Sequence, residues 1–463
     1  MKKMMLVATS GLTLLSLQAA WAGVSADQAA QLKTTLTPFG SIRAGSADGL
    51  IPTWTGGDTT PVAGAPSNGI PSSPYAGDTK ILTINANNYT QYQDKLSDGV
   101  IALIERYPGF HIDVYPTHRT AAAPQWVYDN IYQNALNSVP VAGGITEGFA
   151  AAYGGIPFPI FDPTDPNAGT ELVWDHMSRW QGSSSYGLKT AYVVNQGVVT
   201  LAAAWHQWCD DPYYQPNGSA STYNGYMTKY RFQFVGPPNL DGSAFMQWQR
   251  ASGDANNLTT VWQYLDGQGR VREAPELTFD TPSGQTNDVS NYDEYFMFNA
   301  SPAQYDWKYV GEKEVYIPYN NNDLFLHSPD AALKAHYIDP DFVRWELHRV
   351  YIVDGTLRPG SRNVMAKRVF YIDEDTHTIM LADEYDAKGN LYHVEMGFNE
   401  VRPDLPGTFL AATVVYNLIT DQYTTGNGPW TIQPYVDPAQ YYAKEAFSAS
   451  LFNAQALAAQ DQY

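Results

Sequence analysis

The segment VMAKRVFYIDEDTHTIMLADEYDAKGNLYHVEM, residues 364–396, carries the clearest structural signal in the sequence. Three runs rich in aromatic and aliphatic residues follow one another there, interrupted at Asp373–Thr376 and at Asp386–Asn390. Both interruptions have the composition of tight turns. Short apolar runs joined by such turns predict a meander of antiparallel strands.

The same two-residue period occurs upstream, between residues 226 and 264. Apolar residues alternate with polar ones there, and Asp241-Gly242 and Asp266-Gly267 stand at turn positions beside the runs. Segments 345–353 and 413–419 predict further strands. Because no helix-length segments alternate with these strands, the pattern favours an antiparallel sheet over a parallel one.

Large apolar side chains are expected to share one face of these strands. An ordinary sheet core explains such a set, and so does the wall of a cavity for a lipophilic ligand in a curved sheet. The expected face comprises Tyr230, Phe232, Phe234, Met246, Trp248, Trp262, Tyr264 and Phe370. The candidate ligand-binding residues among them are Met246, Trp248, Trp262, Tyr264 and Phe370.

The N-terminus has the features of a secretory signal peptide. Lys2 and Lys3 precede a mostly apolar stretch that ends at Leu17, and Ala20-Trp21-Ala22 matches a small-x-small cleavage site. The apolar stretch is shorter than the roughly 18 residues that span a bilayer, so cleavage after Ala22 is predicted rather than anchoring. We expect an exported protein of the bacterial periplasm, where a single cysteine, Cys209, suits the oxidising environment.

The chain is expected to divide into a β body and flanking segments. Apolar spacing predicts helices over 26–36 and 85–107, the second interrupted at Asp98-Gly99, and residues 39–68 have an extended, Gly- and Pro-rich composition. Asp437-Pro438 predicts the start of a helix that continues to about Ala459. The predicted parts are a signal peptide at 1–22, an N-terminal strap with helices at 23–125, an open-barrel body at 126–436 and a C-terminal helix at 437–463.

Composition excludes several classes of protein. The 27 Lys and Arg residues against 47 Asp and Glu residues give a net charge of −20, which disfavours binding to nucleic acid or to anionic headgroups. Charged residues make up only 16% of the chain and apolar residues 44%, so a folded core is expected rather than an acidic disordered chain.

Familiar catalytic motifs are missing from the sequence. It has no Gly-x-Ser-x-Gly nucleophile elbow, no His-Glu-x-x-His zinc motif and no Gly-rich phosphate loop. His327 and His336 are interpreted as surface residues, and Asp373–Asp375 as ordinary turn residues. No catalytic residue, metal or cofactor is therefore predicted. A pair of carboxylates for glycoside cleavage stays open, because 47 acids allow many pairs in space.

Several strings of the sequence together resemble the bacterial domain-of-unknown-function family 1329. They extend from residue 36 to about residue 420, which is nearly the whole mature chain. The strings are LTPFGSIRAGSADGLIPTWTGG (36–57), YPTHRTAAAP (115–124), GGIPFP (154–159), YDWKYVG (305–311), YIPYNN (316–321) and RVFYIDED (368–375).

This resemblance implies a fold similar to the periplasmic lipoprotein carriers LolA and LolB. That fold is mainly β (α+β), an open antiparallel half-barrel with peripheral helices, to which this chain adds an extended N-terminal strap. The resemblance also implies envelope traffic of lipophilic molecules beside a resistance-nodulation-division transporter and an outer-membrane protein. The family has no agreed catalytic residues, so none is carried over. This chain is far longer than a lipoprotein carrier and its Trp54-Thr55-Gly56-Gly57 lead has no counterpart there, so the resemblance alone does not imply lipoprotein cargo.

The first string is interpreted as a structural motif of the strap rather than as a ligand site. Its glycines allow positive φ angles and tight turns, so that the chain can follow the surface of the body closely. The motif residues are Pro38, Gly40, Gly45, Asp48, Gly49, Pro52, Trp54, Gly56 and Gly57.

These features favour a periplasmic protein without a cofactor that binds and transfers a hydrophobic molecule, such as a lipid, a sterol-like compound or an acyl ligand. Two alternatives stay open. An accessory subunit of an efflux or secretion assembly would expose an apolar patch and need no ligand of its own. A hydrolase would place close carboxylates at a polar cleft.

Overall fold

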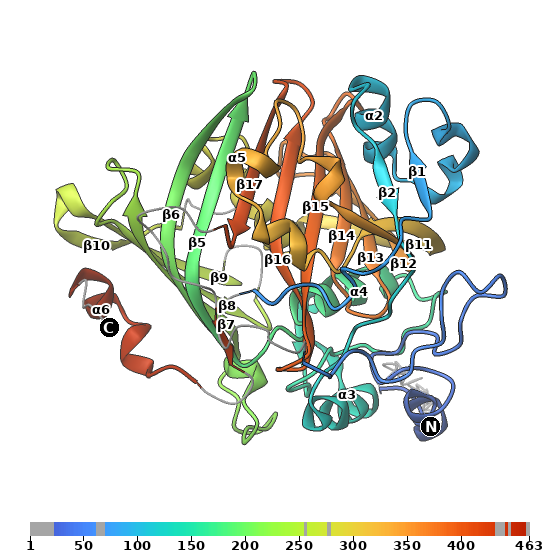
Figure 1. The fold of residues 1–463 in the computed structure, drawn as a ribbon. Helices are drawn as coiled ribbons and strands as arrows, with labels where there is room; N and C mark the ends of the chain where they lie inside the picture. Colours follow the sequence, from blue (N-terminus) through green and yellow to red (C-terminus); the bar gives the residue numbers. More distant parts are fainter. Residues whose placement is uncertain are drawn as a thin grey trace, which may run out of the picture.

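The computed structural model describes residues 23–61, 70–253, 257–275, 279–430, 440–442 and 446–459 (Figure 1). The predicted signal peptide, residues 1–22, lies outside them. Within the described residues, sixteen strands form one sheet, and the short strands β3 (Val139–Val141) and β4 (Gly144–Ala150) form a separate hairpin. Across these same ranges, no helix is long and apolar enough to cross a membrane.

The large sheet is curled but not closed into a barrel (Figure 1). Its order is β1-β2-β12-β13-β14-β15-β16-β17-β5-β6-β7-β8-β9-β10, with β11 beside β12 and β18 beside β5. The pairs are antiparallel apart from the parallel contact of β2 with β12. The predicted fold, mainly β with an open antiparallel half-barrel, is confirmed. The strands are β1 (Leu82–Ile84), β2 (Ile112–Val114), β5 (Ser184–Asn195), β6 (Val198–Asp210), β7 (Tyr226–Gly236), β8 (Ala244–Arg250), β9 (Thr259–Leu265), β10 (Arg270–Glu273), β11 (Tyr305–Pro318), β12 (Arg344–Leu357), β13 (Lys367–Asp373), β14 (Ile379–Tyr385), β15 (Leu391–Arg402), β16 (Gly407–Asn417), β17 (Gln422–Gly428) and β18 (Gln440–Tyr442).

Both predicted meanders form. In the first, β13, β14 and β15 pair in sequence order, and Phe370, Ala382 and Glu395 stand opposite one another across the three strands. In the second, β7, β8 and β9 pair in the same way. The hairpins form at the predicted turns. Successive side chains of each strand point to opposite faces of the sheet, and burial of these faces fixes the register.

Helices are few and short. The predicted helix over 85–107 contains two 3-10 turns and then α2, which begins at the predicted interruption Asp98-Gly99 and is capped by the Ser97 hydroxyl. A side chain at Gly99 would meet Asp383 and Val394, so glycine lets the helix approach the sheet closely. The helices are α1 (Ala26–Ala29), α2 (Asp98–Arg106), α3 (Gln125–Asn137), α4 (Ala168–Met177), α5 (Pro329–Ala332) and α6 (Ala454–Ala459), with 3-10 segments η1 (Ala30–Lys33), η2 (Tyr89–Gln91), η3 (Gln93–Lys95), η4 (Pro212–Tyr214), η5 (Asp266–Gln268), η6 (Gly284–Thr286), η7 (Tyr292–Met297), η8 (Pro302–Gln304), η9 (Asn322–Leu326), η10 (Pro340–Phe342) and η11 (Ala449–Leu451).

The prediction of one continuous helix from Pro438 to about Ala459 is wrong. Gln440–Tyr442 is the strand β18, which pairs with Ser184–Tyr186 of β5. On that side of β5, β17 pairs only from Thr190 onward, and β18 takes the backbone groups that β17 does not reach. Pairing at a sheet edge of this kind outweighs the helix preference of an Ala-rich segment, because tertiary contacts override intrinsic propensity. The described helix in this region is the six-residue α6.

Apolar side chains pack on both faces of the central strands. On one face, Phe370 and Ile372 of β13 pack with residues of α3, α4 and the strap. On the other face, Tyr371 of β13 and Leu381 of β14 pack with residues of α2 and η9. The central strands are therefore covered on both faces, and their polar side chains are enclosed within the protein.

Candidate functional site

The residues predicted to bind a ligand do not lie together. Met246, Trp248, Trp262 and Tyr264 share one face of β8 and β9, whereas Phe370 belongs to a different core cluster on β13. The expectation that all eight apolar side chains share one face is therefore wrong. Residue parity defines faces within a strand, but the register between strands decides which faces coincide.

The register of β7 against β8 separates the aromatic residues into two opposite sets. Met246 stands opposite Arg231 and Trp262, while Phe232 stands opposite Phe245. Tyr230, Phe232 and Phe234 thus face away from the predicted ligand residues. The three of them pack with Trp205 and Phe245 in a cluster of their own.

The set that contains Met246 is covered by the C-terminal segment. Leu451, Phe452 and Leu457 pack on Met246, and Trp248 and Trp262 are half-buried at the margin of this contact. Arg231 donates hydrogen bonds to the carbonyl oxygens of Leu451 at 3.3 Å and Ala456 at 3.2 Å. In Figure 1, α6 lies along the outer side of β7–β10.

The set that contains Phe232 faces the inside of the curled sheet. Tyr292 of η7 packs against Phe245, Tyr295 against Phe232 and Phe296 against Tyr230, with ring centroids 5.3–6.1 Å apart. The same short segment η7 also contacts β14, β15 and β16. A single segment can touch both walls of the sheet only if it lies between them.

The backbone of η7 is unusual. Phe296 and Met297 have φ angles of 55° and 74°, in the left-handed region that residues with a side chain rarely adopt. Tyr295 and Phe296 are only half-buried, although they lie between two sheet walls. A small pocket of about 30 Å³ adjoins Phe296, with Lys189, Asp211 and Tyr230 in its lining. This pocket holds about one water molecule, so η7 itself occupies most of the space there.

Burial strongly shifts the titration of the polar residues around that pocket. Burial lowers the pKa of Lys189 to about 8 and raises the pKa of Asp211 to about 7. It also raises the pKa of the Cys209 thiol, so this cysteine is held in its unreactive protonated form.

Two other pockets of the described residues are polar. One of about 240 Å³ is lined by Tyr75, Asp78 and Arg344, among others, and Asp78 accepts a hydrogen bond from Arg344 at 2.6 Å. The second, of about 600 Å³, is an open depression near Glu147 and Arg250. Neither has the apolar lining that a lipophilic ligand requires.

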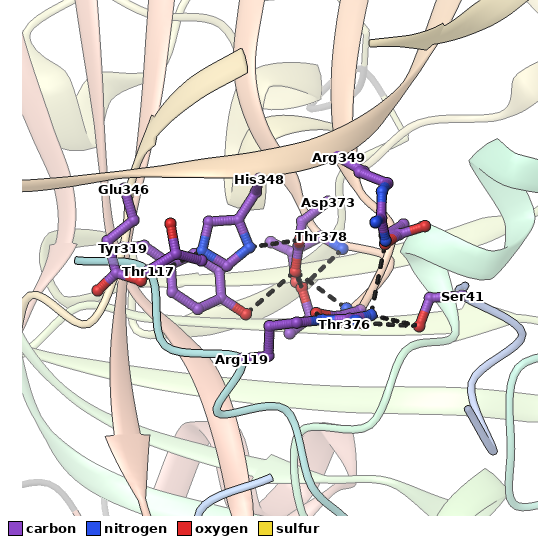
Figure 2. Close-up of polar contacts among 12 residues, drawn as sticks. Ser41, Thr117, Arg119, Tyr319, Glu346, His348, Arg349, Asp373, Thr376 and Thr378 are labelled. Carbon is purple, nitrogen blue, oxygen red and sulfur yellow. Dashed lines mark hydrogen bonds and ion pairs between the residues drawn. The ribbon is translucent and has the colours of Figure 1, made fainter. Parts of the chain in front are cut away.

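Arg119 is the centre of a buried ion-pair cluster that joins the strap to the sheet (Figure 2). Its Nε and Nη2 atoms donate to the two oxygens of Asp375 at 2.7 and 2.6 Å. Glu374 lies 3.4 Å from Arg119 and 3.1 Å from Arg349. Ser41, from the strap, donates to Asp375 at 2.7 Å. We call Ser41, Arg119, Arg349, Glu374 and Asp375 the strap cluster.

The two acids of the strap cluster titrate differently. Burial raises the pKa of Glu374 to about 8, and the neighbouring Asp375 charge adds to the effect. Burial also acts to raise the pKa of Asp375, but the hydrogen bonds and charge of Arg119 outweigh it and hold that pKa below its usual range. Asp375 is therefore the ionised partner of Arg119.

His348 lies between two carboxylates next to the strap cluster (Figure 2). Its Nε2 is 3.3 Å from Glu346 and its Nδ1 is 3.5 Å from Asp373, while the hydroxyl of Tyr319 donates to Asp373 at 3.1 Å. Burial lowers the pKa of His348, but the two carboxylates outweigh it and raise the pKa to about 9. The imidazole is therefore positively charged at neutral pH.

The charge on His348 should make stability fall as pH rises. The pKa of about 9 in the folded protein lies above the value of 6.5 for an unperturbed histidine, so the stabilisation is complete below pH 6.5 and is lost as pH rises through 9. Between pH 6.5 and 9, we expect the unfolding free energy of the wild type to fall by about 3 kcal/mol through His348, and we expect this fall to be absent in His348→Gln. Urea unfolding of both proteins across this pH range measures the difference, and equal slopes would contradict the prediction.

Several residues of the strap motif contact the body through backbone atoms of one or both partners. Trp54 is buried and its indole N–H donates to the carbonyl oxygen of Ala121 at 3.0 Å. Gly40 has a φ of 93°, and a Cβ atom there would collide with Pro159. Arg119 also lies 3.4 Å from the carbonyl oxygen of Pro52. The others form turns or lie along the strap: Pro38, Gly45, Asp48, Gly49, Gly56 and Gly57.

The sequence reasoning missed the members of the strap cluster. The acids of Asp373–Asp375 do form a hairpin turn, but they are buried, so their interpretation as ordinary turn residues is wrong. Ser41, Arg119 and Asp375 each lie in a different one of the family strings. The available signal was the presence of charged residues in strings that otherwise consist mainly of small or apolar residues. Such a residue needs a partner of opposite charge when it is buried, so these strings could have been expected to meet in space.

Comparison with known proteins identifies relatives of this chain. A family model described as "Protein of unknown function (DUF1329)" matches residues 83–458. An uncharacterized protein of Pseudomonas aeruginosa is 36% identical over 435 residues, which cover 91% of this chain and 92% of that protein.

Two solved structures are among the matches. A DUF1329 family protein from Desulfovibrio piger has a TM-score of 0.42 at 16% identity, covering 64% of this chain and 100% of that chain. A LolA superfamily protein from Nitrosomonas europaea has a TM-score of 0.34 at 9% identity, covering 62% of this chain and 98% of that chain.

Proposed function

The chain belongs to the DUF1329 family of proteins of unknown function, and from its own structure we propose that it binds an apolar molecule inside the curled sheet and transfers it within the periplasm. The observation that carries this proposal is the aromatic inner face of β7 and β8, which is covered by η7. A flexible apolar chain or a sterol-like ring system has the chemistry to replace the half-buried rings of Tyr295 and Phe296 on that face.

The proposed site differs from the one expected from the sequence. Met246, Trp248, Trp262 and Tyr264 lie on the opposite face under the C-terminal segment, and Phe370 lies in the core. The inner face instead presents Trp205, Phe232 and Phe245 toward η7. The left-handed backbone at Phe296 and Met297 is strained, and strain lowers the free-energy cost of leaving that conformation. This supports the proposal that a ligand can displace η7.

A binding role also suits the burial of the acidic residues. Glu384 and Glu395 are close carboxylates with no exposed surface, so a glycan or ester substrate has no route to them as a catalytic pair. We therefore propose a non-catalytic role. Cooperation with an envelope transporter and an outer-membrane protein is part of the same proposal and follows from the family resemblance.

A fluorescent fatty-acid analogue tests the proposed site. We expect Phe296→Gly to bind the probe at least about threefold more tightly than the wild type, because the variant lacks the ring that a ligand must displace. Because glycine accepts the left-handed backbone at this position, the variant is expected to keep the fold of η7, so that the missing ring is the main change. Fluorescence titration of the purified proteins, repeated with a fluorescent sterol, measures the dissociation constants.

Trp262→Ala is the matched control on the opposite face. It removes a large half-buried ring from β9 but should leave the dissociation constant unchanged. Loss of binding in Trp262→Ala with no effect of Phe296→Gly would move the site to the outer face. Absence of probe binding in both the wild type and Phe296→Gly would contradict the carrier proposal.

A further inference from the structure

A second buried group of ionisable residues surrounds the N-terminal end of η7. It consists of Asp293 and Glu294 of η7, Arg368 of β13, Glu384 of β14, and His393 and Glu395 of β15, and we call these six residues the Arg368 cluster. All six side chains are buried, none with more than 2% of its surface exposed. They come together because Glu384 and His393 are cross-strand partners, Glu395 follows two residues later on the same face, and η7 packs across both strands.

Its hydrogen bonds leave part of the cluster without partners. Arg368 binds Asp293 at 2.6 Å and Glu384 at 2.8 Å, and His393 Nδ1 lies 2.5 Å from Glu294. Within the described part of the chain, no basic or amide group donates a hydrogen bond to the carboxylate of Glu395, whose neighbour is the carboxyl group of Glu384, and His393 Nε2 has no partner. Buried polar atoms of this kind are rare in folded proteins, because each costs about 1–3 kcal/mol when unpaired.

The charges of the Arg368 cluster do not balance. Four carboxyl groups face one guanidinium and one imidazole. The neighbouring buried network has a smaller excess of acids, since Glu346, Asp373, Glu374, Asp375 and the half-buried Asp78 face four basic side chains: Arg119, Arg344, His348 and Arg349. The larger excess of carboxyl groups over basic groups is therefore a specific property of the Arg368 cluster and not of every buried network in this protein.

The spacing of the donor atoms suits a shared cation. One oxygen of Glu294, one oxygen of Glu384 and one nitrogen of His393 all lie within 4.8 Å of one another. The carboxylate of Glu395 lies outside this set of three but is next to Glu384 in the same cluster, and the charges of Glu384 and Glu294 both act on it. Imidazole nitrogen together with carboxylate oxygen is a donor set that first-row divalent metals accept, zinc among them.

We propose that Glu294, Glu384 and His393 bind a divalent transition-metal ion, of which Zn²⁺ is the first to test, and that the neighbouring Glu395 completes the site as the fourth ligand when the ion binds. Four protein ligands without solvent access are typical of a structural rather than a catalytic metal site. The ion offsets the excess of buried carboxyl groups and fixes the N-terminal end of η7 to β14 and β15. This site does not depend on the apolar ligand proposed above, which would contact other residues of η7.

Metal analysis of the full mature chain, produced without a polyhistidine tag, tests the proposal. We expect about one equivalent of zinc by inductively coupled plasma mass spectrometry, retained in chelator under native conditions because the site is buried. Unfolding in denaturant with chelator should release the metal. Refolding with Zn²⁺ should restore one equivalent and give a higher Tm than refolding without metal.

Variants separate this site from surface binding. Glu395→Gln and His393→Gln each keep a side chain of similar size and should lose the metal. His111→Asn is the matched control, because His111 lies 3.2 Å from Asp341 and 3.8 Å from Asp113 in a more exposed group that could also hold zinc. We expect it to keep full occupancy.

Two results would overturn the proposal. One is wild-type protein that contains no metal as purified and gains none, with no change of Tm, when refolded with Zn²⁺, Mn²⁺ or Fe²⁺. The other is occupancy that survives His393→Gln but is lost in His111→Asn. If either cluster variant does not fold, refolding of the wild type with and without metal decides alone. Metal uptake with a higher Tm supports the site, and its absence means that the buried carboxyls are neutralised by protons instead.

Discussion

Replacement of Arg119 by methionine is expected to lower the free energy of unfolding by about 3–5 kcal/mol, since it leaves buried carboxylates without their cation. Arg119 is buried and holds both oxygens of Asp375, and it also donates to the carbonyl oxygen of Ile42 in the strap at 2.8 Å. The loss combines uncompensated charge at Asp375 with the lost hydrogen bonds from Arg119 to the strap. Urea unfolding followed by circular dichroism measures the change.

Two further variants distinguish a buried charge from a general loss of arginine. Arg106→Met removes an exposed arginine that lies 3.4 Å from Asp421, and should cost less than about 1 kcal/mol. Asp375→Asn placed in the Arg119→Met protein should recover part of the lost stability, because it removes the unpaired charge. Equal losses for Arg106→Met and Arg119→Met would contradict the strap-cluster interpretation.

Replacement of Phe370 by alanine should also cost about 3–5 kcal/mol, because it opens a cavity in a closely packed core. The Phe370 ring has no exposed surface and packs against Trp307 and Phe298, with ring centroids 5.2 and 5.5 Å away. Since both of these rings are themselves buried, little relaxation is expected to fill the space. Thermal and urea unfolding both report the loss.

Trp262→Ala provides the comparison for this change. Its larger ring is half-buried on β9 and lies 5.1 Å from Trp248 at the margin of the C-terminal segment. Atoms with no neighbour on one side contribute less to stability, so Trp262→Ala should cost clearly less than Phe370→Ala. A larger loss for Trp262→Ala would show that the outer face, and not the β13 core, dominates the stability.

Strand positions follow from local pattern, and the sequence predicts them well. The runs in 364–396 and 226–264 form the expected hairpins, because alternation and turn residues act over only a few neighbours. The strands β11 and β17 were missed, and so was the long hairpin of β5 and β6. Its turn at Gln196-Gly197 has φ angles of 48° and 79°, and the β-branched runs on either side of an Asn-Gln-Gly string could have indicated it.

The faces of those strands depended on register between strands, which alternation alone does not define. The Asp241-Gly242 turn aligns Phe232 with Phe245, and so Met246 and Trp262 lie on the outer face. A shift of one residue would exchange the two faces, which is why correctly predicted strands β7, β8 and β9 still produced a divided ligand site.

The amino-acid sequence by itself determined the antiparallel β class, the meanders, the family and the Gly-rich strap, because each depends on residues close together in the chain or on strings that can be read directly. Only the tertiary structure decided which charges are buried together. Ser41 and Asp375 are 334 positions apart, and Glu294 and His393 are 99 apart, yet both pairs are within hydrogen-bonding distance. The cost of burying a charge is set by its neighbours in space, and those neighbours are brought together by the curl of the sheet and by the segments that pack across it.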